Sequence, residues 1–150
     1  MIALIQRVSH AHVDIAGLTV AAIDRGILAL IGVEADDDAT TGERLLERIL
    51  GYRIFPDAGG RMNLDLGEVG GGLLLVPQFT LVADTSKGTR PGFSHAASPD
   101  AARGQFEALC GTARARHPVV AAGRFGADMQ VSLTNDGPVT FNLRVPPPQT

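Results

Sequence analysis

The sequence predicts one α/β domain in which a mixed, largely antiparallel β-sheet is covered by helices. Apolar runs of strand length fill the first and last thirds of the chain, whereas two segments with helical periodicity lie between them. The length of 150 residues, 45% of them hydrophobic, suits a single core and would be crowded as two domains. Since the chain has no internal repeat, we expect residues 1–150 to form one domain.

Composition narrows the class of protein. The amino-terminal run reaches Arg7 after a few apolar residues, which predicts neither a signal peptide nor a membrane span. Cys110 is the only cysteine, so an internal disulfide is excluded and a reducing cytoplasm is the expected location. A formal net charge of −3 argues against broad coating of nucleic acid, although it allows a small basic rim that holds a few phosphates. We expect no DNA or membrane partner.

The first third of the chain predicts an antiparallel meander. Its β-like segments are Ile2 to Val8, Ala11 to Ile15, Leu18 to Ile23 and Ile27 to Val33. Ser9 and His10 separate the first two segments, and Asp24-Arg25-Gly26 predicts a turn before the last one. That last segment has no polar alternation, which is typical of a strand buried on both faces of a sheet.

A first helix is expected where Thr40 and Glu43 have the spacing of a capping box. The apolar residues that recur there at helical period are Leu45, Leu46, Ile49 and Leu50. Gly51 is a suitable helix end. Residues 56–60 then predict a turn, and residues 63–69 predict an irregular segment.

The most unusual stretch is the apolar run from Gly70 to Val82, because Pro77 and Gln78 interrupt it. A proline inside a strand removes a ladder donor, so it is normally confined to an edge or to a bulge. Bulges gather beside active sites, and we therefore expect the backbone N–H groups from Gln78 to Thr80 to face a ligand. The alternative is a plain edge strand whose proline prevents aggregation.

A polar loop and a second helix follow. Within the loop, residues 87–93 combine two cations, two glycines and an aromatic residue, a composition that suits ligand contact as well as solvent exposure. Ser98-Pro99-Asp100 is a strong helix start, and Pro118 closes the helix. The apolar stripe of this helix consists of Phe106, Leu109, Cys110 and Ala113. Cys110 is therefore expected to be a small core residue.

The last third predicts two strands. Apolar residues alternate with polar ones at Met129, Val131 and Leu133, and again at Val139, Phe141, Leu143 and Val145. Asn135-Asp136-Gly137 between them is a hairpin signal. Pro138 then predicts either a cis peptide bond or a hairpin corner that is stiffened by proline. The tail 146–150 is rich in proline and is expected to be extended and mobile.

Conventional catalytic machinery is hard to find in the sequence. His10 and His12 are the only closely spaced histidines, and no third ligand with metal spacing accompanies them, so we expect no metal. A glycine-flanked nucleophilic serine, a phosphate-cradling glycine-lysine loop and a dinucleotide fingerprint are all missing, so we expect no cofactor. Residue chemistry alone predicts a soluble α/β domain with two unusual proline sites.

The sequence at those two sites resembles the D-aminoacyl-tRNA deacylases, or D-tyrosyl-tRNA deacylase family. The two motifs are Gln78-Phe79-Thr80-Leu81 and Asn135-Asp136-Gly137-Pro138-Val139-Thr140. Further matching segments are Ile2-Ala3-Leu4-Ile5-Gln6-Arg7-Val8, Gly51-Tyr52-Arg53-Ile54-Phe55, Arg90-Pro91 with Phe93, Gly123-Arg124-Phe125 and Ala127-Asp128-Met129-Gln130-Val131. The resemblance thus covers Met1 to about Val145. The family usually has serine at the position of Pro77, and a related deacylase class with a different chiral preference has proline there.

The resemblance implies a three-layer α/β/α fold of the deacylase type and a homodimer with two sites at its interface. It implies hydrolysis of D-aminoacyl-tRNA and of glycyl-tRNA on non-cognate tRNA, with rejection of L-aminoacyl-tRNA. In such a dimer Gly137-Pro138 of one subunit reaches the site of the other, its carbonyls hold the amino group, and Arg7 locks the element. The implied catalytic residues are Gln78, Phe79 and Thr80, and those implied for substrate binding and chiral selection are Gly137, Pro138, Arg7, Met129, Asn135 and Thr140.

The implied reaction does not require a nucleophilic side chain or a general base from the protein. An aminoacyl ester is already activated and the neighbouring ribose hydroxyl can assist, so positioning and oxyanion stabilisation are sufficient. Backbone N–H groups near Phe79 and Thr80 are the candidates for that stabilisation. Thr80 as a covalent nucleophile is the alternative, but the sequence shows no adjacent base to activate it. A function of another class is a non-catalytic dimeric module that binds amino acids or RNA ends.

Overall fold

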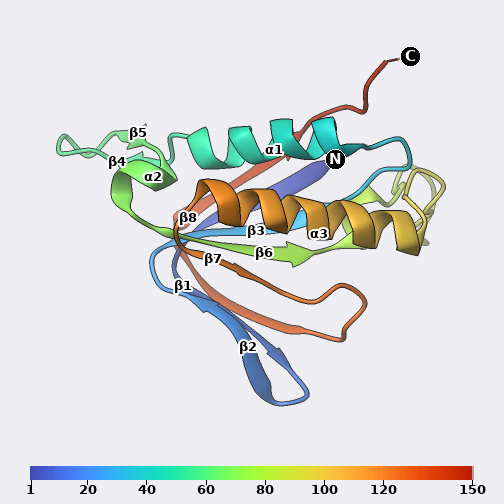
Figure 1. Cartoon of the computed structure of the whole chain (residues 1–150), viewed down its shortest axis with the longest axis horizontal. Coiled ribbons are helices and arrows are strands. Elements are labelled where there is room, and N and C mark those ends of the chain that lie inside the picture. The colour runs from blue at the N-terminus through green and yellow to red at the C-terminus, as the bar shows by residue number, and fades with distance from the viewer. Residues whose placement is uncertain (150) are drawn as a thin grey trace.

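A computed structural model describes residues 1–149 as a single α/β domain with two long helices (Figure 1). The strands are β1 (Ile2–Ile15), β2 (Leu18–Ile23), β3 (Gly26–Gly32), β4 (Phe55–Pro56), β5 (Met62–Leu64), β6 (Gly72–Pro77), β7 (Val120–Ala122) and β8 (Gln130–Arg144). The helices are α1 (Ala39–Gly51), α2 (Leu66–Val69), the 3₁₀ helix η1 (Phe79–Val82) and α3 (Pro99–Arg116).

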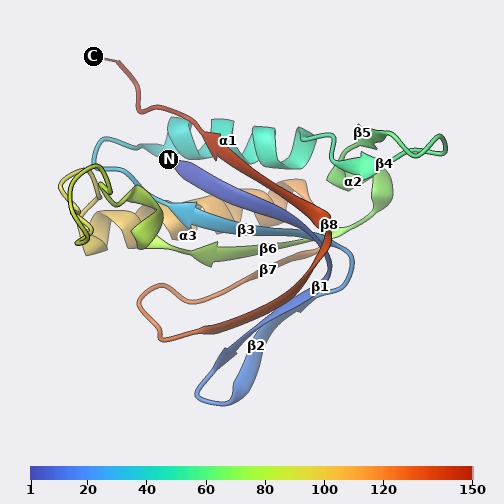
Figure 2. The same ribbon diagram turned by 180° about the vertical axis from the view of Figure 1, so that it is seen from behind.

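The long strand β1 is the spine of the main sheet. Along one edge its first half pairs antiparallel with β3 and its second half pairs antiparallel with β2. Along its other edge it pairs antiparallel with β8 from end to end (Figure 2). Beyond β3 the sheet continues through β6 and β7, and both of these pairings are parallel. The predicted mixed sheet is confirmed, although its parallel share is larger than expected.

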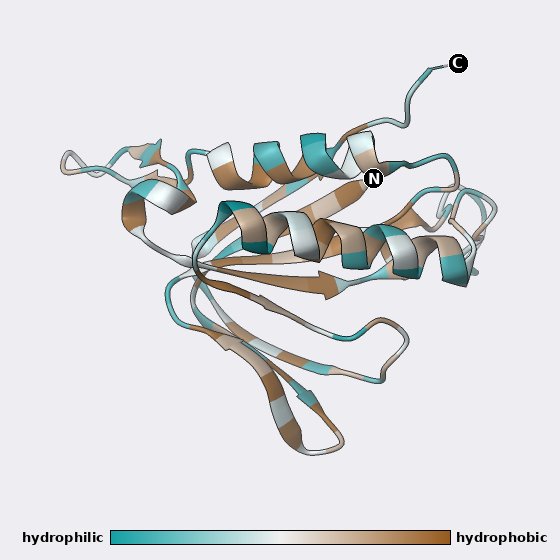
Figure 3. Ribbon diagram, viewed as in Figure 1, coloured by the Kyte–Doolittle hydropathy of each residue, from teal (hydrophilic) through white to brown (hydrophobic). Residues whose placement is uncertain are grey.

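The sheet has a hydrophobic core on each face. Strand β3 contributes Ile27, Ala29 and Ile31 to the core beneath α1 and α3, and Leu28 to the core on the opposite face. The prediction of a strand buried on both faces is therefore confirmed. In Figure 3 the apolar side of α1 faces the sheet and its hydrophilic side faces away.

The expected three-layer arrangement is met only in part, because both long helices cover the same face (Figures 1 and 2). On the opposite face the sheet curls until β2 contacts β6 and β7, which makes it nearly barrel-like. Residues from four strands fill this second core: Val8, Ala11, Val13, Ala21, Ile23, Leu28, Leu74 and Val76. On this face the curved strands bury the apolar residues that a second layer of helices would otherwise cover. The alternation of apolar residues in the sequence predicts that a face is buried, but not whether helices or strands bury it.

The opening meander also differs from its prediction. Residues 2–15 form one strand that runs through Ser9 and His10, and β3 pairs with β1 rather than with β2. The buried positions are odd-numbered up to Ile5, then shift to Val8, and the pairing with β8 is irregular at the same place. This bulge turns the second half of β1 toward the other core. Two separate strands, Ile2 to Val8 and Ala11 to Ile15, were therefore predicted where one irregular strand exists.

Local capping decides where the helices begin. The N-cap of α1 is Asp38, two residues before the predicted Thr40, and its side chain accepts a hydrogen bond from the backbone N–H of Thr41 in a capping box. Asp65 and Glu68 form another capping box and start α2 within residues 63–69, which were predicted to be irregular. The predicted start of α3 is confirmed, since the Ser98 side chain accepts a hydrogen bond from the Ala101 N–H.

Strand β6 shows why a proline is tolerated inside the sheet. Pro77 was expected at an edge strand or at a bulge, but β6 is neither. It lies between β3 and β7 and ends at Pro77. The Leu75 carbonyl faces β7 and the Gln78 N–H faces β3, so the nitrogen of Pro77 points toward β7. Pairing with β7 has already stopped at Leu75, and no ladder donor is lost.

An ion-pair cluster closes the end of the sheet where β1 starts. Glu34 accepts hydrogen bonds from Arg144 (Nε 3.1 Å and Nη2 2.9 Å) and from the amino group of Met1 (3.2 Å). Burial opposes its charge, but these partners outweigh burial and hold the pKa of Glu34 below its ordinary 4.5. Burial raises the pKa of Asp37, although the Met1 amino group lies 2.8 Å from its Oδ1.

No helix among residues 1–149 is long and apolar enough to cross a membrane. Pro146 to Gln149 have no regular secondary structure, and Thr150 lies outside the described residues. The expected mobility of the tail 146–150 stays a prediction.

The close approach of β3 to β6 gives a stability test. A Cβ atom on Gly26 would lie 1.9 Å from the Gly72 backbone oxygen, so Gly26→Ala should destabilise the fold by at least about 3 kcal/mol. Gly104→Ala is the matched control, because this exposed position in α3 has open space and alanine favours helix, for a gain of about 0.5–1 kcal/mol. Chemical denaturation measures both changes, and a Gly26→Ala protein as stable as the wild type would contradict the described strand contact.

Candidate active site

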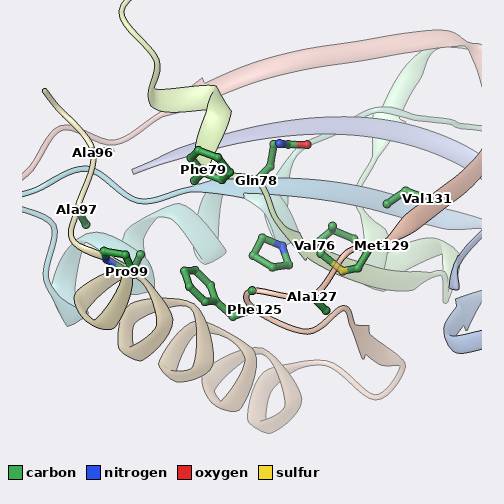
Figure 4. A pocket seen from close by; sticks show the side chains of 13 residues that line it. Val76, Gln78, Phe79, Ala96, Ala97, Pro99, Phe125, Ala127, Met129 and Val131 are labelled. Carbon is green, nitrogen blue, oxygen red and sulfur yellow. The ribbon is translucent and has the colours of Figure 1, made fainter. Parts of the chain in front are cut away.

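A mostly apolar pocket opens where β6 ends, between η1, the start of α3 and the segment that follows β7 (Figure 4). Its volume is about 460 Å³, within the range of small-molecule sites. It is lined by Val76, Pro77, Gln78, Phe79, Ala96, Ala97, Pro99, Ala102, Phe125, Gly126, Ala127, Met129 and Val131. The structure therefore brings the predicted site residues Gln78, Phe79 and Met129 together at one cavity.

Two backbone donors are free at the rim of this pocket. The Gln78 N–H donates to the Ile31 carbonyl at 2.7 Å, and the chain then turns into η1. Within residues 1–149 the N–H groups of Phe79 and Thr80 have no hydrogen-bond acceptor, because they begin a helix that leaves its first donors unpaired. The N–H groups of Phe79 and Thr80 are thus available to a ligand, whereas that of Gln78 is not, and contact with a ligand stays a prediction.

The Thr80 hydroxyl has an amide rather than a base beside it. Gln78 Nε2 donates to Thr80 Oγ1 at 2.5 Å, and no histidine or carboxylate of the described residues hydrogen-bonds to that hydroxyl. A threonine hydroxyl needs an adjacent base to become a nucleophile. The geometry therefore suits Thr80 as a polar anchor for Gln78.

Aromatic residues that residue-by-residue reasoning did not assign to a site form part of this one. Phe79 is 61% exposed, and its ring lies against Phe93 of the polar loop with centroids 5.3 Å apart. Phe125 lines the same pocket on the side of α3, across from Phe79 (Figure 4). Met129 itself packs so closely that a Cβ atom on Gly123 would lie 2.8 Å from its sulfur. Only the mixed composition of residues 87–93 and the matching Gly123-Arg124-Phe125 segment pointed to these residues.

The second motif is a protrusion from one strand, and the predicted hairpin is wrong. Both halves of β8 pair with β1, since Asn135 lies opposite Val8 and Thr140 lies opposite Gln6. Four residues, 136–139, therefore stand against the single residue Arg7 and bulge out of the ladder. Gly137 and Pro138 at the tip are exposed, and the peptide bond between them is cis, one of the two predicted alternatives.

The base of this protrusion is closed by one side chain. Asn135 Oδ1 accepts the Val139 N–H at 2.7 Å, while its Nδ2 donates to Thr140 Oγ1 at 2.8 Å. Gly137 has φ +151°, and a Cβ atom there would lie 2.6 Å from the Val139 side chain. Only glycine therefore fits the tip.

Arg7 holds the protrusion from below. Its Nε donates to the Asp136 carbonyl at 2.8 Å and its Nη1 donates to the Ile54 carbonyl at 2.7 Å. The Asp136 carboxylate lies 3.7 Å away, and the Arg7 side chain is only 13% exposed. The fork of the guanidinium thus ties the protrusion to the connection between α1 and β4.

The pocket and the protrusion lie at opposite ends of the sheet in one chain. Arg7 is paired with Ile27 at the start of β3, whereas Gln78 bonds to Ile31 near its end. Ile27 and Ile31 are four residues apart along β3, so the protrusion and the pocket are separated by about 13 Å along the strand. The structure therefore does not bring Pro138 to the pocket of its own chain.

The histidines are engaged in ordinary polar contacts. His10 Nε2 lies 3.2 Å from Thr134 Oγ1, and His12 Nε2 lies 3.5 Å from the Asp14 carboxylate. Among residues 1–149, no group of three or more histidine, cysteine, aspartate or glutamate side chains is arranged to hold a metal ion.

Comparison with known proteins identifies the family. Residues 4–144 match the family model described as D-Tyr-tRNA(Tyr) deacylase, a span that includes the pocket motif and the protrusion. The chain belongs to the D-Tyr-tRNA(Tyr) deacylase family. A D-aminoacyl-tRNA deacylase of Methylococcus capsulatus is 62% identical over 147 residues, covering 98% of this chain and 96% of the relative. One of Thioalkalivibrio sulfidiphilus is 61% identical over 149 residues, with 99% and 100% covered.

Two solved structures resemble this chain in fold. A structure described as the c-Myc DNA Unwinding Element Binding Protein superposes with a TM-score of 0.93 at 35% identity, covering 97% of this chain and 99% of the other. A structure described as a probable eukaryotic D-amino acid tRNA deacylase has a TM-score of 0.77 at 18% identity, with 95% and 98% covered, and shows the same fold.

The contacts of Arg7 predict a local effect of its removal. Arg7→Ala takes away two charged hydrogen bonds and leaves the buried Ile54 carbonyl unpaired, which should cost about 1–3 kcal/mol of stability. Amide hydrogen exchange should accelerate more at residues 136–139 than in α1 or α3. Arg61→Ala, at an exposed side chain with no partner among the described residues, is the control. Equal protection of the protrusion in Arg7→Ala and wild type would show that Arg7 does not hold it.

Proposed function

We propose that this deacylase family member hydrolyses the ester bond that joins a D-amino acid to tRNA, releasing the amino acid and free tRNA. Glycyl-tRNA on a non-cognate tRNA is a second substrate, and L-aminoacyl-tRNA is rejected. The observation that carries the proposal is the family match over residues 4–144, a span that includes both motifs. The acceptor end of aminoacyl-tRNA is the partner, and the cytoplasm is the proposed location.

The rim of the pocket supplies the chemistry that ester hydrolysis requires. Attack on the ester carbonyl develops negative charge on its oxygen, and preorganised N–H donors stabilise such a charge. The free N–H groups of Phe79 and Thr80 are the donors that we assign to this oxygen. The ribose 2′-hydroxyl, held beside the ester by the substrate itself, assists the attack.

The distance between the two motifs supports a homodimer. Pro138 lies too far from the pocket of its own chain, yet its exposed tip is free to enter the pocket of a second chain. In that arrangement the Gly137 and Pro138 carbonyls hold the substrate amino group, while Arg7, Asn135 and Thr140 keep them in place. An L side chain then meets backbone that cannot rotate away, and a D side chain or glycine does not.

A non-catalytic module that binds amino acids or RNA ends is the other class of function. Such a module would use the same pocket, and the unpaired N–H groups at its rim would bind a carboxylate or phosphate oxygen, so turnover is what distinguishes the two functions. Release of D-tyrosine from D-tyrosyl-tRNA by the purified protein separates the two functions, because the module binds this tRNA without turnover.

Chirality gives a direct prediction. D-Tyrosyl-tRNA and glycyl-tRNA should be cleaved, whereas L-tyrosyl-tRNA should survive with a kcat/KM lower by a factor of about 100 or more, because a backbone clash of several kcal/mol separates the enantiomers. The measurement is release of labelled amino acid at equal enzyme concentration. Comparable hydrolysis of both enantiomers would contradict exclusion, and Pro77→Ser, which restores the usual family residue, then tests whether Pro77 is the cause.

The catalytic route gives another prediction. Thr80→Ala should keep at least about a tenth of the wild-type kcat, since the backbone N–H remains, whereas a tRNA that ends in 2′-deoxyadenosine should be cleaved at least about 100-fold more slowly. Thr80→Ser is the matched control, because it keeps the hydroxyl that contacts Gln78. A folded Thr80→Ala protein that binds tRNA but is inactive would instead support covalent catalysis.

Subunit mixing tests the shared site. Phe79→Ala damages the pocket and Gly137→Ala damages the protrusion, so each homodimer should be nearly inactive. A heterodimer contains one undamaged pocket facing one undamaged protrusion, and about half of the wild-type activity per heterodimer should return after subunit exchange. If heterodimers form and activity does not return, the site is not shared between chains.

A further inference from the structure

A groove rich in arginine lies beside the pocket, between α3 and the segment that follows β7. Its volume is about 380 Å³, and it is lined by Arg103, Arg114 and Arg124 with Glu107 and Cys110. On α3, residues 103, 107, 110 and 114 recur at helical spacing and so share one face of the helix. Arg124 faces them from the connection between β7 and β8.

The three arginines have no partner in the part of the chain that the structure describes. None of them takes part in an ion pair within 4.0 Å or in a side-chain hydrogen bond, although Glu107 lies in the same groove. Some other arginines are engaged, as Arg144 is with Glu34 and Arg116 is with Glu47. Arg44, Arg61 and Arg90 also have no such partner among the described residues, but they do not line this groove. In a chain with 13 cations against 16 carboxylates, three unpaired arginines in one groove indicate an anionic ligand.

Phe125 connects this groove to the active-site pocket. Its side chain lines both cavities, and the Arg103 guanidinium carbon lies 5.1 Å from the centre of its ring. Stacking on an aromatic ring holds the guanidinium in place while its N–H groups remain available. A ligand that fills the pocket can therefore continue past Phe125 into the groove.

Cys110 does not provide the chemistry of the groove. Burial raises the pKa of its thiol to about 11, although the charge of Arg114 lowers it. A protonated, buried thiol is a poor nucleophile and a poor metal ligand. The arginines are thus the groups that recognise a ligand here.

We infer that the groove binds backbone phosphates of the tRNA strand whose 3′ end carries the ester. The inference rests on the proposed function, because that function places the aminoacyl end in the adjacent pocket. Arg103 and Arg114 are eleven residues apart on α3, which is about 16 Å, too far to converge on one phosphate. A chain of phosphates spans this length, and arginine binds each of them through its forked donors.

Two substrates separate phosphate binding from ester cleavage. D-Tyrosyl-tRNA has the phosphate chain, whereas the 3′-O-D-tyrosyl ester of adenosine has the same reacting bond and no phosphate. The variant R103Q/R114Q/R124Q should lose at least tenfold in kcat/KM on the tRNA substrate and stay within about threefold of wild type on the adenosine ester. The control variant R44Q/R61Q/R116Q removes the same charge elsewhere and should change neither value by more than about twofold.

Binding of uncharged tRNA gives a readout that does not depend on catalysis. In fluorescence anisotropy over a salt series, the slope of log K against log salt should become shallower by about 0.7 for each lost contact with a single strand, or about 2 for the groove variant. If that variant does not fold, the single Arg124→Gln change, in a connecting segment, should reduce the slope by about 0.7.

Several outcomes would overturn the inference. The first is unchanged tRNA binding in the groove variant, the second is an equal loss on both substrates, and the third is an equal loss in the control variant. If the wild type cleaves neither substrate, the proposed function fails instead, and the salt slope still decides whether the groove binds phosphates.

Discussion

Hydrogen bonding along both edges of β1 is the constraint on which the rest of the structure depends. The strand pairs with β3 and β2 on one side and with β8 on the other, so it fixes the position of the whole sheet. Its bulge at Val8 sends the first half to the core beneath the helices and the second half to the core inside the curled sheet. Since both long helices cover one face of the sheet, the apolar residues on the other face are buried by curvature of the strands themselves.

The same strand explains the geometry of the proposed site. Between Gln6 and Val8, β1 is too short to pair with every residue of β8, and residues 136–139 are forced out of the ladder. Asn135 and Arg7 satisfy the polar groups that this releases, and Val139 is buried in the core, so both hydrogen bonds and packing hold the protrusion. A backbone element fixed in this way is suited to excluding a substrate by shape. The arginine groove at the other end of the sheet would then orient the nucleic acid.

Local signals predicted a large part of the fold and of the site. Capping residues and periodicity located both long helices, and the uninterrupted apolar run of β3 predicted its burial on both faces. Gln78, Phe79 and Met129 were expected at a site and line one pocket. The Pro77 bulge and the hairpin at Asn135 were wrong for one reason. Proline and glycine report local backbone conformation, whereas a bulge or a hairpin is defined by the partner strand.

The sequence by itself determined the elements whose cause lies within a few residues, such as the cap at Ser98, the apolar stripe of α3 and the need for glycine near Pro138. Only the tertiary structure decided which strands pair, that both helices cover one face, and that the pocket lies about 13 Å along the sheet from the protrusion. The physical reason is that pairing and curvature depend on contacts between residues far apart in the chain. Such contacts leave no periodic pattern in the sequence around either partner.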